Sequence, residues 1–582
     1  MYLLLSLILG IIAFFCTISF KNFAETVVYG VVAGVSTMIM SWIIMWFGQP
    51  VISMSYGIWI YYMLIPAIIV FVVKCVGVGN SDMDFSFGGL APLVVVVLGL
   101  FYCLFTSTGM FASRSMQKML QATEMSDSAY CKDMAQIQPE SMILVDEELA
   151  LKYAQAALEQ NPATGSVCEI STLSIQNLNG SFRVHLADGS EKTLTFKNEQ
   201  VYVAPLEHRS FFKWKSNRST PGYILVSAMK QNVVYFVTKV NGEDVHLKYL
   251  ESACFADYWV RHLRHSGYSN VKFADQNVEL DDNGRPFMII PVQENTKAYT
   301  CPDITKVIIL DIQNGNAKDY SLQDVPEWVD RIYPSKMIEK RIAWWGDYQR
   351  GWWNAQFAQV DVKSQTPGIE QVYTDGDCYW YTGIQSAGAD DGTSGFMLTN
   401  TRTGKSKLYP ISGVNEEASR QKIKNYKIDA ANIEPSRVLM YNIKNEPTYF
   451  ATCKAESGEF MGYAFASVKY RDVCGVGKSV NEAYEAYGRA LRSSRNDVSL
   501  EGKVVENEKT FTVLDVTRDD DNYYFLFSED PKKEFRCPND VSIELKWTRI
   551  GDIVSVSYDE EGPDSKVKVL NSFDNKRVQL LE

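Results

Sequence analysis

The histidines are the first side chains whose type and spacing could support chemistry. His262 and His265 stand three apart in a stretch predicted to be helical, a spacing that lets two imidazoles share a metal ion. Arg261 and Arg264 flank them, and cations beside such a site oppose metal binding. Because the chain has only five histidines, we interpret this stretch as a basic, solvated helix face and predict no metal site.

Acidic and glycine-rich segments could bind cations or phosphate. Asp281-Asp282 and Asp390-Asp391 offer carboxylates of the kind that calcium prefers, but both pairs fall where hairpin turns are expected. Gly475-Val-Gly477-Lys478-Ser479 resembles the end of a phosphate loop, yet Asp472 stands where that loop needs its first glycine. We therefore predict no catalytic residue, no cofactor and no enzyme. A membrane-tethered hydrolase, whose His and Asp residues would meet only in the fold, is kept as an alternative.

The most unusual segment is aromatic. Five of the 12 tryptophans lie within the 26 residues 328–353. Trp345, Tyr348 and Trp352 share one face of a predicted helix, and Trp328 precedes it. Such side chains can fill a partner's pocket, stack on sugars or lie at a membrane interface. We favour a core between modules and keep these four residues as candidates for interaction.

Charge divides the chain into an apolar N-terminal part and an acidic body. The 582 residues contain 57 Lys and Arg and 69 Asp and Glu, a formal net charge of -12. Residues 1–112 hold only five of these charged side chains: Lys21, Glu25, Lys74, Asp82 and Asp84. An acidic body lacks the basic surface that attracts nucleic acid, so nucleic acid is not an expected partner.

Residues 1–112 are predicted to form a four-helix transmembrane domain. Four apolar runs, about 2–20, 26–47, 56–73 and 89–108, are each long enough to cross a hydrocarbon layer of about 30 Å as a helix. No Asp, Glu, His or Arg lies within them, which argues against an ion-coupled pump. Gly30 and Gly34 form a small-residue face for close helix packing, either within the bundle, which we favour, or between copies of the chain.

The remaining chain alternates in the manner of an α+β body with antiparallel sheets. Helices are expected at about 146–160, 251–265 and 479–493, between strand-and-turn segments. The short strands after residue 498 are typical of a small OB-like or SH3-like β-barrel. The predicted parts are the transmembrane domain at 1–112, a stalk at 113–145, α+β modules at 146–248, 249–365 and 366–497, and the barrel at 498–582.

A short pattern recurs within the predicted strands. Asp311 to Tyr320 parallels Asn400 to Tyr409, and a third copy runs from Ser457-Gly458 to Tyr463, with five residues from Gly to Tyr in each. Each copy predicts a strand, an Asx-type turn closed by a left-handed Gly, and a returning strand with an inward Tyr. Lys454 departs from the pattern, because the third copy needs an acidic or amide residue there.

This pattern resembles the PepSY family of small α+β modules, in which a helix packs on a hairpin-rich sheet. The likeness covers about residues 150–370, and residues 371–493 in altered order. The resemblance implies extracytoplasmic modules that bind proteins or restrain peptidases, and it brings no catalytic residues.

Together these features predict a membrane-anchored, non-enzymatic scaffold or regulatory binding platform at a bacterial-type envelope. Its partners would be the lipid bilayer and other proteins, including a second copy of the chain. The main alternative is a channel or transporter subunit whose oligomeric bundle forms a pore gated by the body. The body is expected outside the cytoplasm, with a cytoplasmic body as the alternative, because its eight scattered cysteines do not decide the compartment.

Overall fold

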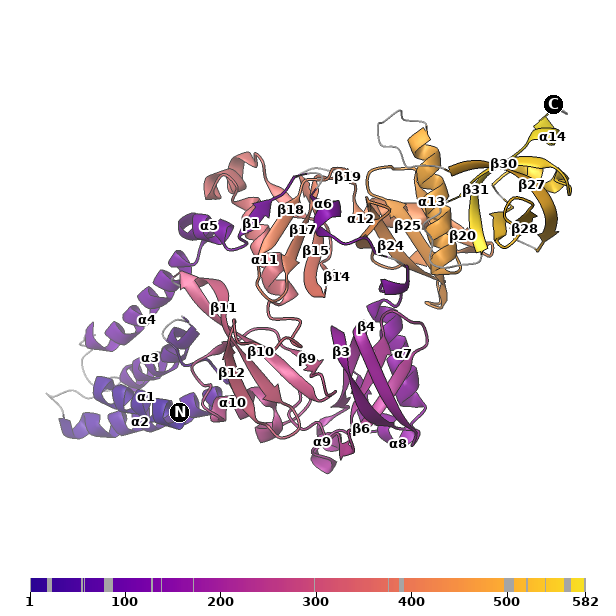
Figure 1. The fold of residues 1–582 in the computed structure, drawn as a ribbon. Coiled ribbons are helices and arrows are strands. Elements are labelled where there is room, and N and C mark those ends of the chain that lie inside the picture. The colour runs from indigo at the N-terminus through magenta and orange to yellow at the C-terminus, as the bar shows by residue number, and fades with distance from the viewer. Residues whose placement is uncertain are drawn as a thin grey trace. The chain divides into compact units, whose positions relative to one another are not determined.

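The structure is a computed structural model, and its ribbon is drawn in Figure 1. It describes residues 2–17, 23–53, 56, 58–77, 87–126, 129–137, 139–170, 172–297, 299–374, 376–386, 392–496, 507–519, 522–539, 541–558 and 567–579. The chain forms two compact units, Met1–Ala486 and Tyr487–Glu582.

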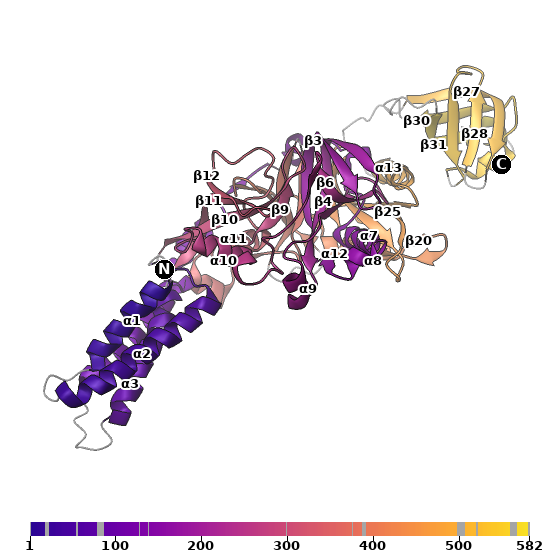
Figure 2. The same ribbon diagram turned by 90° about the horizontal axis from the view of Figure 1, so that it is seen from below.

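Apolar helices form the N-terminal end of the first unit. Figure 2 shows α1, α2 and α3 side by side, and each of these helices contacts the other two. α1 and α2 meet at Gly10 and Gly34: a Cβ atom on Gly34 would lie 3.0 Å from the Gly10 carbonyl oxygen, so glycine permits this approach. Gly34 thus packs within the chain, and Gly30 is buried on the same helix. The helices are α1 (Tyr2–Thr17), α2 (Phe23–Gly48), α3 (Ile58–Gly77) and α4 (Phe87–Thr106).

The predicted four-span bundle is wrong. Among the described residues, one helix, Thr26–Gly48, is long and apolar enough to cross a membrane. A second is added only if Val94–Thr106 and Gly109–Lys118, which are bent by 45°, count as one broken span. The other apolar helical stretches, Tyr2–Thr17 and Met63–Val73, are shorter than the about 20 residues that a crossing needs. The runs predicted from hydropathy at 2–20 and 56–73 are longer than the apolar helical stretches described there, so apolar composition alone does not establish a span.

The rest of the first unit is built from four copies of one arrangement, a helix followed by four antiparallel strands in chain order. The first module has α7 (Glu147–Glu159) and β3 (Ser174–Leu186), β4 (Glu191–His208), β5 (Tyr223–Ser227) and β6 (Val234–Val240). The second has α10 (Trp259–His265) and β9 (Asn277–Leu280), β10 (Pro286–Lys297), β11 (Thr300–Asp311) and β12 (Ala317–Ser321). The third has α11 (Ser335–Asp347) and β14 (Glu370–Thr374), β15 (Asp377–Ser386), β17 (Gly395–Asn400) and β18 (Ser406–Tyr409). The fourth has α12 (Glu416–Lys424) and β23 (Leu439–Ile443), β24 (Glu446–Lys454), β25 (Phe460–Ser467) and β26 (Cys474–Gly477).

The turn between the third and fourth strands shows that these are true repeats. The side chain of the last residue in the third strand accepts backbone N–H bonds from the turn in every module: Ser227, Asp311, Asn400 and Ser467. The carbonyl of the next residue accepts backbone N–H bonds from the segment leading into the same module's helix: Ala228, Ile312, Thr401 and Val468. The same hydrogen-bond pattern therefore connects the sheet to the segment before the helix in each of the four modules.

These turns correct the predicted repeat. The copies at Asp311 and Asn400 are equivalent, and Gly315 and Gly404 have φ values of +81° and +68°, the left-handed conformation expected. The turn at Gly458 joins β24 to β25, the second and third strands of its module. The equivalent turn lies one hairpin later, after Ser467. The third copy was misplaced because that turn has no glycine to mark it.

The described residues within 113–145, predicted as a stalk, lie against the modules. α5 (Gly109–Lys118) packs on α11, and β1 (Ala122–Glu124) adds to the third sheet as a parallel partner of β18. Shared cores join successive modules: Phe182 with Leu280, Ile309 with Met397, and Phe396 with Tyr449. The modules therefore behave as one packed body.

The second unit contains a closed β-barrel with the strand order β27-β28-β29-β31-β30. Phe511, Phe525, Phe527 and Phe535 fill its interior. A 3-10 helix, η4 (Ile543–Trp547), precedes β30. The coarse prediction of an α+β body with several antiparallel sheets is confirmed. The barrel strands are β27 (Asn507–Arg518), β28 (Asn522–Phe527), β29 (Glu534–Pro538), β30 (Ile553–Tyr558) and β31 (Val567–Asn575).

Candidate functional site

The structure divides the tryptophan-rich segment into a buried and a surface half. Trp345, on α11, is buried in the core shared by the second and third modules. Trp328 packs at the edge of that core with its ring centroid 5.5 Å from that of Phe287. These two residues hold modules together and leave little surface for a ligand.

Tyr348 and Trp352 lie farther along the segment, against the first residue of α5. A Cβ atom on Gly109 would lie 2.8 Å from Tyr348 Cζ and 2.9 Å from Trp352 Cδ1, so the two rings need a glycine there. Beyond them Trp353 and Phe357 are exposed, and sequence analysis missed Phe357. A π-helical turn, η3 (Asn354–Ala358), interrupts the regular helical period that could have revealed it.

A buried pair of carboxyl groups lies where the first three modules meet. Glu279 on β9 is fully buried, and its oxygens accept N–H bonds from Asp330 (2.8 Å) and Arg331 (3.1 Å). One Asp330 carboxyl oxygen accepts the N–H of Asn177 on β3 at 2.5 Å, and the Asp330 carbonyl accepts the Thr401 hydroxyl at 2.6 Å. The pair thus connects β3 of the first module, β9 of the second and the segment that leads into α11 of the third.

Burial sets the protonation of this pair. It raises the pKa of Glu279 to about 7, against the lowering effect of the hydrogen bonds from the backbone of Asp330 and Arg331. Burial, followed by the charge on Glu279, raises the pKa of Asp330 well above its ordinary range. Burial also raises the pKa of the neighbouring Cys378 thiol, which favours its neutral form. Burial thus favours the protonated forms of Glu279, Asp330 and Cys378, so the described residues of this site present no activated nucleophile.

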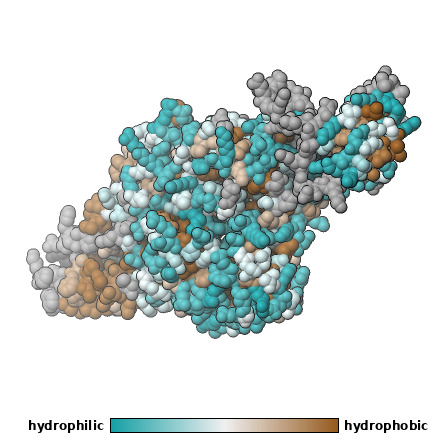
Figure 3. Space-filling model, in the orientation of Figure 1, coloured by the Kyte–Doolittle hydropathy of each residue, from teal (hydrophilic) through white to brown (hydrophobic). Residues whose placement is uncertain are grey.

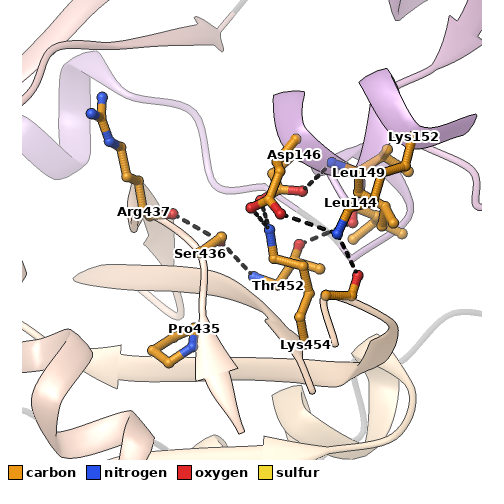
Figure 4. A network of polar contacts seen from close by, with 12 residues as sticks. Leu144, Asp146, Leu149, Lys152, Pro435, Ser436, Arg437, Thr452 and Lys454 are labelled. Atoms are coloured by element: carbon orange, nitrogen blue, oxygen red, sulfur yellow. Dashed lines mark hydrogen bonds and ion pairs between the residues drawn. The ribbon is translucent and has the colours of Figure 1, made fainter. Parts of the chain in front are cut away.

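A second polar junction joins the first module to the fourth (Figure 4). Lys454 on β24 is buried, and its ammonium group donates to Asp146 at 2.7 Å and to Glu148 at 2.6 Å. Asp146 also caps α7 by accepting the Leu149 N–H. The Thr452 hydroxyl donates to the Leu144 carbonyl at 3.0 Å beside this ion pair. The lysine that departs from the repeat pattern therefore has a structural role.

The remaining candidates serve the backbone. His262 Nε2 lies 2.7 Å from the Gly315 carbonyl oxygen, and His265 Nδ1 lies 2.8 Å from that of Arg261. Asp281 caps its own turn by accepting the N–H groups of Asn283 and Arg285. Asp390-Asp391 lies outside the described residues. Within the described part of the chain, no three His, Cys, Asp or Glu side chains are grouped to hold a metal ion.

The barrel carries an exposed apolar patch. Ile543 and Trp547 on η4 are 79% and 66% exposed, and Ile550 and Ile553 follow them at the surface. Figure 3 shows hydrophobic residues on the barrel's surface as well as over the N-terminal helices. Monomeric proteins rarely leave contiguous large apolar side chains in water unless a partner covers them. We call Ile543, Trp547, Ile550 and Ile553 the barrel patch.

Comparison with other proteins adds no assignment to these sites. The chain matches no protein-family model and no curated protein sequence, so the resemblance to the PepSY family has no support from them.

Proposed function

We propose that this protein is a non-enzymatic binding platform, anchored to a membrane by the helix Thr26–Gly48. That helix is the one described segment that qualifies as a span by itself. The four modules supply a stiff body, because shared cores and the polar junctions at Glu279 and Lys454 connect them. The function is presentation of a binding surface.

The barrel patch is the observation that carries this proposal. Tryptophan is among the side chains that dominate the binding free energy of protein interfaces, and here Trp547 and three isoleucines are exposed within the short segment 543–553. The barrel interior is filled by its own phenylalanines. The patch is therefore available for a second protein, either a different chain or another copy of this one.

Photocrosslinking tests this assignment in the full chain. We expect p-benzoylphenylalanine at Trp547 to give a discrete protein adduct, and the same residue at the exposed Lys532 of the barrel to give none. Changing Ile543 and Ile550 to Asp should abolish the adduct, because charge on the patch opposes its burial. Equal adducts at both positions, or none at Trp547, would refute the platform.

The compartment of the body is a separate question. We keep the expectation that the body lies outside the cytoplasm as a prediction. A cysteine in place of the exposed Phe212 on α9 (Phe211–Ser216) should react with a membrane-impermeant maleimide in intact cells. Reaction only after permeabilisation would place the body in the cytoplasm.

A further inference from the structure

An exposed aromatic edge extends from the surface half of the tryptophan-rich segment. The ring centroids of Trp352 and Trp353 are 4.8 Å apart, and those of Trp353 and Phe357 are 5.6 Å apart in a stacked arrangement. Phe357 is 74% exposed, and Val360 after it is also exposed. We call Trp353, Phe357 and Val360 the aromatic edge.

This edge continues a row of aromatic rings from the apolar helices. Phe101 stacks on Phe105 along α4 at 6.5 Å, and Phe105 lies 4.3 Å from Phe111 on α5. Gly109, two residues before Phe111, is the glycine against which Trp352 packs. The side of α4 that bears these rings is exposed along its length, from Val94 onward. The edge is thus joined to the apolar helices, which pack successively from α2 to α3 and from α3 to α4.

Positive charge accompanies the apolar surface at this place. α5 buries Ala112, Ser113 and Met116 and exposes Met110 and Phe111 together with Arg114 and Lys118. Lys297 also reaches α5, donating to the Phe111 carbonyl at 3.2 Å. In a chain with a net charge of -12, a helix that exposes aromatic and basic side chains together is suited to an anionic surface.

We propose that the aromatic edge and the outer side of α5 lie in the headgroup region of an anionic lipid bilayer. Tryptophan favours that region because its ring is apolar and carries a polar N–H group, and basic side chains there attract anionic headgroups. If the aromatic edge instead bound a pocket on a partner protein, it would not need to be continuous with the exposed side of α4. The inference rests on the proposed membrane anchorage and orients the body at the surface.

Lipid photocrosslinking tests the location directly. The full chain is reconstituted into vesicles of equal parts phosphatidylcholine and phosphatidylglycerol, with p-benzoylphenylalanine at Phe357 or at Phe212. Both side chains are 74% exposed, so the pair is matched. We expect phospholipid adducts at position 357 that exceed those at position 212 at least tenfold. Equal yields, protein adducts alone or no adduct at position 357 would overturn the inference.

The basic side chains give an independent measurement. Each basic residue near an anionic surface strengthens the attraction about fivefold, so R114Q with K118Q should lower phosphatidylglycerol adducts at position 357 several-fold. The matched K213Q and K215Q pair on α9 should not. An unchanged adduct yield in the R114Q and K118Q variant would contradict the inference that Arg114 and Lys118 attract anionic headgroups. Extraction of the whole chain from vesicles by carbonate would refute the membrane anchorage. A chain that stays anchored but gives no lipid adducts at position 357 would refute only the headgroup location of the aromatic edge.

Discussion

Two buried polar junctions hold the modules together. Each must stabilise ionisable side chains away from water, and the two do so with opposite chemistry. Between the first and fourth modules, one buried ammonium group, Lys454, meets the carboxylates of Asp146 and Glu148. Where the first three modules meet, the carboxyl groups of Glu279 and Asp330 are buried, and Glu279 accepts backbone N–H bonds. One junction pairs opposite charges, whereas the other avoids charge by holding protons.

The pKa directions express this difference. Hydrogen bonds from Lys454 and Lys152 lower the pKa of Glu148, so the paired junction favours the ionised acid. Burial raises the pKa of Glu279 to about 7, so the second junction favours the neutral acid. Near neutral pH the first junction is therefore at full strength, while the second is close to losing a proton.

Removing both acids of the paired junction should have the largest effect. The double variant D146N/E148Q keeps an oxygen that can cap α7 but leaves the Lys454 ammonium buried without a counter-charge. Breaking a fully buried pair in this way costs about 3–5 kcal/mol, and partial solvation of the two acids places this loss at the lower end of that range. Urea denaturation of the full chain at pH 7 would measure this loss of unfolding free energy.

The controls separate charge from packing. E147Q alters an exposed acid in the same helical turn and should change the unfolding free energy by less than about 0.5 kcal/mol. Lys454→Met removes the buried charge and leaves two partly solvated carboxylates, so its cost should be smaller than that of the double variant. If Lys454→Met were the more damaging change, the lysine would act by packing and hydrogen bonding, and the ion pair would not explain the junction.

The protonated junction should lose stability as pH rises. The folded-state pKa of Glu279, about 7, exceeds the value near 4.5 of an unfolded chain, so the folded state retains a proton that the unfolded state has released. Its contribution is complete below about pH 4.5 and is lost by about pH 7, a change of about 3 kcal/mol. We expect E279Q to reduce the slope of unfolding free energy against pH in that window. An unchanged slope would show that the folded state does not raise the pKa of Glu279 above its unfolded value.

Local chemistry made part of this fold readable from the sequence. Asp311 and Asn400 each precede a glycine by four residues, and an Asx turn with a left-handed glycine depends only on those neighbours. Alternating hydrophobicity likewise indicated the antiparallel sheets. The turn after Ser467 uses the same side-chain cap without glycine, so the fourth module was placed one hairpin too early.

Contacts between distant residues could not be read in this way. Lys454 lies 308 residues from Asp146, and in the sequence it was only a departure from a repeat. Glu279 and Asp330 are 51 residues apart and belong to no motif. The helical period of Trp345, Tyr348 and Trp352 gave no sign that the segment divides into a core half and a surface half. Similarly, the apolar runs at the N-terminus indicated helices without showing which of them is long enough to span a membrane.

The smallest effect expected comes from the second proton of the acidic junction. Once Glu279 is ionised, its charge opposes ionisation of Asp330, so Asp330 releases its proton at a higher pH. Its raised folded-state pKa gives stability that falls as pH rises above the ordinary range of an aspartic acid, by about 1 kcal/mol per pH unit for one proton. D330N should flatten that decline in unfolding free energy while an amide oxygen still accepts the Asn177 N–H. A decline that persists in D330N would show that another group holds the second proton. The acidic junction would then have one proton-holding acid, Glu279, in place of two.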